Sequence, residues 1–187
     1  RFSLAPKVDV FGIDDEACGQ IAAETLLARG YKRLAFLGGP QAATSTQSRL
    51  RGFLSELQRA GGPTPDITFA EAYSFEAGRA EMQRLLRETT PAEAYFCGDD
   101  VLSIGALSAI RDHGLRVPED IGLIGVNDMQ MSGWQNINLT TIAQPFAEII
   151  QTSIDVIVDM LQAPKQPAQA RRLPCRLVER GTLRARP

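Results

Sequence analysis

The stretch AYFCGDDVLSIGALSAIRDHGLRVPEDIGLIGV at residues 94–126 decides the fold. It predicts a strand over residues 94–98, a helix over residues 101–112 and a second strand over residues 121–126. Pro118, in the connecting VPED, prevents the helix from continuing. Both predicted strands are almost entirely apolar, as expected for strands that are covered by helices on both faces.

The same alternation extends towards the N-terminus. Strands are predicted at residues 8–13, 34–39 and 67–72, and amphipathic helices at residues 15–29, 48–60 and 75–87. Strand–helix units in series predict an α/β fold, a doubly wound parallel sheet with helices on both faces, as in Rossmann-like three-layer domains.

After residue 126 the pattern changes. A polar loop is predicted at residues 127–138, then a short strand at 139–143, an apolar helix at 145–162, a Pro- and Gln-rich linker at 163–170 and a final strand at 173–179. The helix at 145–162 has more apolar surface than a solvated helix needs. We therefore expect it to pack on a second layer or on another polypeptide.

Composition limits the class of protein. The 187 residues are 44% hydrophobic and 22% charged, which is typical of a globular domain. A net charge of −2 does not indicate a large basic surface for nucleic acid. No apolar run reaches the roughly 18 residues of a membrane span.

Three cysteines, Cys18, Cys97 and Cys175, lie far apart in the sequence and form no C-x-x-C pair. Their odd number and their spacing fit neither a zinc site nor a disulfide framework. We expect reduced thiols in a cytoplasmic protein.

The predicted sheet places a ligand site beyond the carboxyl ends of its strands. The loops at that edge and the start of the following helix hold the candidate residues Arg49, Tyr73, Asp99, Asp100, Asn127, Asp128 and Trp134. A guanidinium, several carboxylates and amides, and two aromatic rings suit a small polar ligand such as a sugar or a nucleoside-like molecule.

Structural roles remain open for the same residues. Asp99 and Asp100 could cap the helix that starts at residue 101, and for Asp100 we favour a capping or other local role. Asn127 and Asp128 could only turn the chain, and the two aromatics could be ordinary rim residues. Arg49 could be solvated in the first turn of its helix, although a cation there opposes the helix dipole, which a ligand or an acidic partner would explain.

Enzymatic signals are weak. The sequence contains no G-x-S-x-G, no P-loop and no G-x-G-x-x-G. The single histidine, His113, ends the helix that starts at the site, so it is predicted at the opposite edge of the sheet. We predict no catalysis, no cofactor and no metal, with a metal-dependent hydrolase using Asp99, Asp100 and Asp128 as a remote alternative.

Six motifs occur in order along nearly the whole chain. They are RLAFLGGP (33–40), RLRGF (49–53), YFCGDDVLSIGAL (95–107), GLRVPEDIGLIGVND (114–128), LTTIAQP (139–145) and LPCRLVERGT (173–182). Together they resemble the effector-binding core of the lactose-repressor (LacI/GalR) family of bacterial transcription regulators.

The resemblance implies a periplasmic-binding-protein-like core of two lobes around a cleft, with most of the N-terminal lobe missing here. Residues 14–142 and 172–187 would form the C-terminal lobe. Residues 1–13 would end the N-terminal lobe and its first crossover, and residues 143–171 would hold a crossover, an N-terminal-lobe helix and a linker.

The resemblance also assigns effector contacts. Arg49 matches an arginine that contacts the effector, Tyr73 an aromatic that stacks on it and Trp134 a cleft aromatic of some members. Asp99 stands where the family usually has Asn, and Asn127 where it usually has Asp. This exchange of donor and acceptor implies a similar cleft with a different specificity.

The function implied is a cytoplasmic sensor of a sugar-like or nucleobase-like effector in a homodimeric regulator, which binds operator DNA through an N-terminal helix-turn-helix absent here. The alternative is the periplasmic sugar-binding component of a transporter. An upstream helix-turn-helix or signal peptide would distinguish the two.

Overall fold

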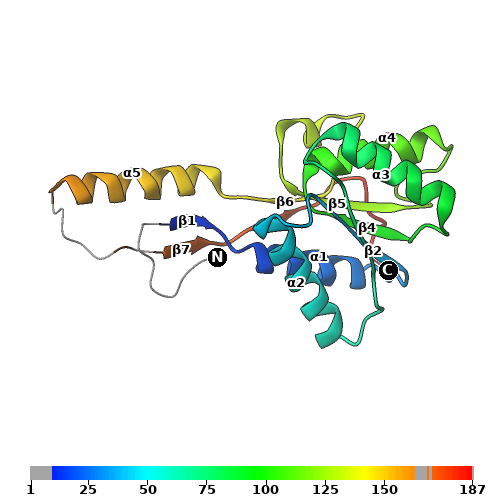
Figure 1. Cartoon of the computed structure of the whole chain (residues 1–187), viewed down its shortest axis with the longest axis horizontal. Helices are drawn as coiled ribbons and strands as arrows, with labels where there is room; N and C mark the ends of the chain where they lie inside the picture. Colours follow the sequence, from blue (N-terminus) through cyan, green and yellow to red (C-terminus); the bar gives the residue numbers. More distant parts are fainter. Residues whose placement is uncertain (1–9, 163–167, 169, 187) are drawn as a thin grey trace.

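Figure 1 shows the computed structural model of the chain, which describes residues 10–162, 168 and 170–186. The helices are α1 Asp15–Leu27, α2 Thr44–Arg59, α3 Phe75–Glu88, α4 Asp100–Asp112 and α5 Phe146–Gln162, with a short 3-10 turn at Gln130–Gly133. The strands are β1 Val10–Ile13, β2 Leu34–Gly38, β3 Asp66–Phe69, β4 Ala94–Cys97, β5 Gly122–Asn127, β6 Thr141–Ala143, β7 Ala170–Leu173 and β8 Arg176–Val178.

Six strands form the main sheet in the order β3-β2-β4-β5-β6-β8. The first five run parallel, with Phe36 opposite Phe96 and Ala35 opposite Tyr95 in the central pair. Strand β8 joins the edge antiparallel to β6. The expected parallel α/β sheet is therefore confirmed, with one antiparallel edge strand added.

Helices cover both faces of this sheet, as expected. Side chains alternate along each strand, so that Phe36 and Phe96 join the core beneath α1 and α2. Leu37 and Tyr95 join the core beneath α3 and α4 instead. The sheet and these four helices form three layers, which we call the body.

Helices α1 and α2 pack with their backbones in close approach. A Cβ atom added at Gly52 would lie 1.9 Å from the Glu16 carbonyl oxygen. Only glycine fits at that crossing, and the approach brings the start of α1 against the third turn of α2.

The remaining elements extend away from the body (Figure 1) and we call them the arm. Strands β1 and β7 form a parallel two-stranded sheet, and α5 runs beside it. Among the residues of α5, only Val156 is buried. The described residues include no helix that is both long and apolar enough to cross a membrane.

Some predicted boundaries were wrong. Helix α2 begins at Thr44, not residue 48, because polar residues without an apolar stripe form its first turn. The strand predicted at 173–179 corresponds to β8, Arg176–Val178, whereas Leu173 at its start is the last residue of β7, which belongs to the other sheet. Ala170, expected in the linker, begins β7, while residues 163–167 and 169 of that linker lie outside the described residues.

Candidate functional site

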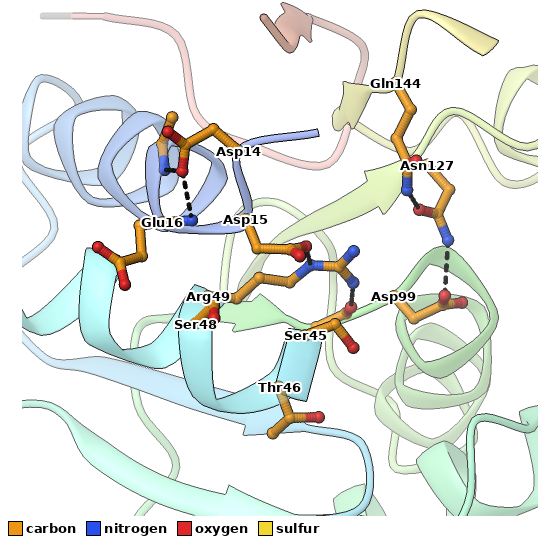
Figure 2. Close-up of polar contacts among 12 residues, drawn as sticks. Asp14, Asp15, Glu16, Ser45, Thr46, Ser48, Arg49, Asp99, Asn127 and Gln144 are labelled. Atoms are coloured by element: carbon orange, nitrogen blue, oxygen red, sulfur yellow. Dashed lines mark hydrogen bonds and ion pairs between the residues drawn. The ribbon is translucent and has the colours of Figure 1, made fainter. Parts of the chain in front are cut away.

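The carboxyl ends of the parallel strands meet above the N-termini of α2 and α4. Figure 2 shows Arg49 on α2, Asp99 at the start of α4 and Asn127 at the end of β5 on this edge. Gln144 follows β6 and reaches the same group.

Arg49 is buried and its guanidinium is held by two acceptors. Its Nε donates to Asp15 Oδ1 at 2.9 Å, and its Nη1 donates to the Gly98 carbonyl at 2.5 Å. Because α2 starts at Thr44, Arg49 lies in the second turn, and the prediction from sequence that it lies in the first turn is wrong. The acidic partner expected for this cation is Asp15, in the first turn of α1.

Asp99 links the helix start to the next loop. Its Oδ1 accepts the Val101 backbone N–H at 2.7 Å, which is the cap of α4, and its Oδ2 accepts Asn127 Nδ2 at 2.6 Å. Burial raises the pKa of Asp99, against the Val101 hydrogen bond, the nearby Arg49 charge and the Asn127 hydrogen bond, which lower it. The Asp99 side chain therefore both caps α4 and lies at the edge of the site.

Asn127 continues this chain of hydrogen bonds. Gln144 Nε2 donates to Asn127 Oδ1, so that Asp99, Asn127 and Gln144 connect three successive strand ends (Figure 2). Asn127 has a φ of 119°, and the following Asp128 has a φ of 55°, so both also turn the chain. Asp128 accepts from Arg180 Nη2 at 2.6 Å.

Tyr73 lies across the end of β2. Its hydroxyl shares hydrogen bonds with Ser45 Oγ at 3.1 Å and Thr46 Oγ1 at 2.5 Å. The ring passes over Gly39, where an added Cβ would lie 2.3 Å from a ring carbon. The glycine therefore allows the ring to lie against the backbone, while Tyr73 as a whole stays 37% exposed.

These groups border a cavity of about 590 Å³. Its lining is Tyr73, Asp99, Val101, Asn127, Asp128, Met129, Gln144 and Phe146. Three of the five predicted effector residues line it, while Arg49 and Trp134 stand outside that lining. Gln144 and Phe146 were missed, although the rule that selected the other loops, applied to the strand at 139–143, would have found Gln144.

A second cavity of about 550 Å³ lies on the other side of Arg49. Its lining includes Asp14, Asp15, Glu16, Ser48 and Arg51 from the starts of α1 and α2, and Arg172 from the arm. Arg49 stands between the two cavities (Figure 2). Its hydrogen-bond partner Asp15 borders the second cavity, and Asp99 borders the first.

Trp134 follows the short turn after β5 and is 50% exposed. That turn is anchored by the fully buried Asp100, which accepts from Met129 N at 2.8 Å, Ser132 Oγ at 2.7 Å and Thr141 Oγ1 at 2.5 Å. Burial raises the pKa of Asp100 to about 6, although the three hydrogen bonds lower it. The local role favoured for Asp100 is therefore confirmed, as an anchor of the loop.

The acidic side chains at this edge and the single histidine lie at opposite ends of α4. Among the residues that the structure describes, no group of His, Cys, Asp and Glu side chains is arranged to hold a metal ion. His113 caps the far end of α4, about 20 Å from Asp99 along the 13-residue helix, and its Nδ1 contacts the Ala109 carbonyl.

Comparison with known proteins identifies the fold family. Residues 23–183 match the periplasmic binding protein-like domain. The HTH-type transcriptional repressor CytR of Escherichia coli (strain K12) is 35% identical over 98% of this chain and 55% of its own length. The chain spans about half the length of the curated relatives it matches.

Solved structures agree. A LacI family transcriptional regulator from Enterococcus faecium with bound ribose has a TM-score of 0.85 and 28% identity, covering 94% of this chain and 65% of that one. The lac repressor dimer bound to operator and an anti-inducer has a TM-score of 0.84 and 30% identity, covering 94% and 60%. The chain therefore belongs to the family of periplasmic binding protein-like domains and groups with the LacI-family regulators.

Proposed function

We propose that this chain is the effector-sensing core of a LacI-family transcriptional regulator, and that in the complete protein its cavity binds a small polar ligand without transforming it. The observation that carries the proposal is the hydrogen-bonded chain Asp99–Asn127–Gln144 on the wall of a cavity of about 590 Å³. Polar groups held in one arrangement on a largely formed cavity are typical of small-molecule sites.

The ligand proposed is a sugar or a related polyol. Asp99 and Asn127 are already oriented by each other, so their remaining lone pairs can accept from neighbouring hydroxyl groups. Tyr73, which is partly exposed on the cavity lining, can cover the apolar face of a ring. The ribose bound by the Enterococcus faecium regulator supports this ligand class.

Arg49 and Trp134 take different parts in the proposal. Two nitrogens of Arg49 donate hydrogen bonds, Nε to Asp15 and Nη1 to the Gly98 carbonyl. The third nitrogen, Nη2, is left to donate to a ligand at the boundary of the cavity that Asp99 lines. Trp134 is exposed on the loop that Asp100 anchors, and it reaches a ligand only if the cleft closes over it.

The domain assignment follows the body and the arm. We assign residues 14–142 and 172–187 to the C-terminal lobe, residues 1–13 to the end of the N-terminal lobe, and residues 143–171 to a crossover, a helix of that lobe and a linker. The separate β1–β7 sheet and the exposed α5 support this division. Ligand binding would then alter the arrangement of two lobes and, reciprocally, operator affinity.

In the complete protein we propose a cytoplasmic homodimer that binds operator DNA through an N-terminal helix-turn-helix. CytR is an HTH-type repressor and the lac repressor structure is a dimer on its operator, which supports this arrangement. The same relatives favour a regulator over a transporter component.

A thermal-shift screen on the complete protein tests the proposal, with ribose, other sugars, nucleosides and nucleobases as ligands. A ligand that binds the folded state raises the melting temperature as its concentration rises. Its affinity, measured by calorimetry, should fall at least tenfold in Asp99→Ala and Asn127→Ala. Asp112→Ala, at the far end of α4, serves as the control and should bind normally.

Two results would contradict the proposal. The first is a screen in which no ligand of these classes stabilises the protein. The second is a ligand whose affinity is the same in wild type, Asp99→Ala and Asn127→Ala.

A further inference from the structure

Tyr73 lies on an exposed connection between β3 and α3. At the start of this connection, Ala70 N donates to the Gly38 carbonyl at 2.8 Å, and at its end the Ser74 side chain caps α3. Residues 71–73, between these two points, are exposed. The orientation of the Tyr73 ring therefore depends on what its own side chain contacts.

The first turn of α2 holds the Tyr73 hydroxyl. This hydroxyl shares a hydrogen bond of 2.5 Å with Thr46 Oγ1 and one of 3.1 Å with Ser45 Oγ. Ser45 is partly exposed, whereas Thr46 is fully buried, so water does not compete for the Thr46 hydroxyl. Leaving a buried hydroxyl without a partner is unfavourable. The bond to Thr46 is therefore the stronger restraint on the end of the Tyr73 side chain.

Gly39 restrains the same ring by a steric contact. An added Cβ at Gly39 would lie 2.3, 2.5 and 2.7 Å from three carbon atoms of the Tyr73 ring. The ring thus lies against the backbone that follows β2 while its hydroxyl is bonded to α2. One polar contact and one steric contact together define the position of the ring.

Thr46 borders neither of the two cavities described above, whereas Tyr73 lines the cavity of about 590 Å³. An effect of Thr46 on a ligand in that cavity must therefore act through Tyr73. Arg49 lies in the next turn of α2 (Figure 2), so the start of this helix carries one residue of the site and holds another in place.

We propose that Thr46 is a positioning residue of the effector site, which fixes the Tyr73 ring before a ligand binds. A side chain that is fixed in advance loses less conformational freedom on binding, so the ligand binds more tightly. Because the ring covers a flat surface, this gain favours a ligand that contains a ring over an open-chain polyol. The inference rests on the proposed function, since it concerns a ligand in the cavity that Tyr73 lines.

The first test needs no ligand. In the complete protein with isotope-labelled tyrosine rings, the NMR signal that is lost in Tyr73→Phe belongs to Tyr73. We expect this signal to move towards that of free tyrosine in Thr46→Val, which keeps the branched shape but loses the hydroxyl. It should stay in place in Thr46→Ser, which keeps the hydroxyl. Thr89→Val is the matched control and should leave the signal unchanged, because Thr89 Oγ1 donates to the Leu85 carbonyl at the end of α3.

The second test is calorimetry on the complete protein, with ribose as the ring-shaped probe and ribitol as its open-chain counterpart. Thr46→Val should weaken ribose binding about three- to tenfold and ribitol binding by less, while Thr46→Ser should bind ribose as wild type does. Tyr73→Phe should weaken ribose binding to a similar extent as Thr46→Val. The double variant should show no further loss, since both substitutions remove the same hydrogen bond. Gly39→Ala, which displaces the ring by contact, should also weaken ribose binding.

The outcomes separate this inference from the proposed function. An unmoved Tyr73 signal in Thr46→Val, equal losses of ribose affinity in Thr46→Val and Thr46→Ser, or additive losses in the double variant would each overturn positioning by Thr46. Each of these results is compatible with a loss of binding in Asp99→Ala, which would still support the proposed function. A thermal-shift screen in which no ligand binds would overturn both.

Discussion

The body and the arm are built from similar amphipathic helices but bury them differently. In the body, α1 to α4 press apolar side chains into two cores, and Phe36, Phe53 and Phe96 are completely buried with ring centroids 5.3–6.3 Å apart. In the arm, Leu161 is 78% exposed, and Phe146, Ile150 and Ile157 are each more than half exposed.

This difference in burial shows what an apolar stripe on a helix can predict. It predicts that the stripe will be covered, but it does not predict which part of the chain or which other polypeptide covers it. The helices of the body find the sheet within the same chain, whereas α5 lies beside the short strands β1 and β7 and, of its own residues, buries only Val156. The expectation that this helix packs on a second layer or on another polypeptide follows from the pattern alone. The candidate site lies where these two regions meet.

Substituting one leucine in each region gives the largest expected effect. Leu57→Ala, at 2% exposure in α2, removes buried methyl groups and leaves a cavity, so it should lower the free energy of unfolding by about 2–5 kcal/mol. Leu161→Ala in α5 should change it by less than about 0.5 kcal/mol. Urea unfolding followed by circular dichroism measures both, and equal losses would remove the distinction between body and arm.

The next effect concerns a charge inside the body. Asp100 has a pKa of about 6 in the folded protein and 3.8 as its ordinary value, so the folded state holds this proton more tightly. The free energy of unfolding should therefore fall as pH rises from about 4 to about 6, by up to about 3 kcal/mol from this group.

Asp100→Asn removes the titration. The difference in unfolding free energy between wild type and Asp100→Asn should therefore change between pH 4 and pH 7, with the wild type losing stability relative to the variant as pH rises. Urea unfolding at several pH values measures this difference. Parallel profiles for the two proteins would show that Asp100 is not buried as described.

The body was largely predictable from sequence. The segment that connects β7 of the arm to β8 of the body was not. The strands at 34–39, 94–98 and 121–126 and the helix at 75–87 appear within one residue at most boundaries, because fully buried parallel strands produce continuous apolar runs. The strand predicted at 173–179 joins the last residue of β7 to β8, although these two strands pair with different partners in different sheets. Pairing is a tertiary property that local pattern does not contain.

The site was predictable in position and less so in detail. The rule for parallel sheets gave Tyr73, Asp99 and Asn127, which line one cavity. It could not show that Asp15 and Gly98 hold Arg49, since that depends on how closely α1 and α2 pack.

Two arginines on α2 allow a buried and an exposed side chain to be compared near the site. Arg49 is buried against Asp15, whereas Arg51 is exposed and pairs with Glu16 at 2.8 Å. Arg49→Ala should weaken effector binding by about 1–3 kcal/mol, the scale for a buried polar group that loses its partner. Arg51→Ala should leave the affinity unchanged.

Calorimetry with the ligand found in the thermal-shift screen compares these two variants, after circular dichroism has shown that both are folded. An affinity of Arg49→Ala equal to that of wild type would remove Arg49 from the site. Equal losses in both variants would point to a general effect of positive charge.

The smallest expected effect lies at the junction itself. Gln144 stands between β6 of the body and α5 of the arm, and it holds Asn127 in the orientation that faces Asp99. Gln144→Ala should weaken effector binding by about 0.5–1.5 kcal/mol, because Asn127 loses one neutral hydrogen bond but keeps the other. Gln151→Ala, whose side chain bonds to Asp155 on exposed α5, is the matched control and should bind as wild type does. A loss in Gln144→Ala as large as that in Asp99→Ala would mean that Gln144 contacts the ligand directly. No loss at all would mean that the hydrogen bond from Gln144 is not needed to orient Asn127 for the ligand.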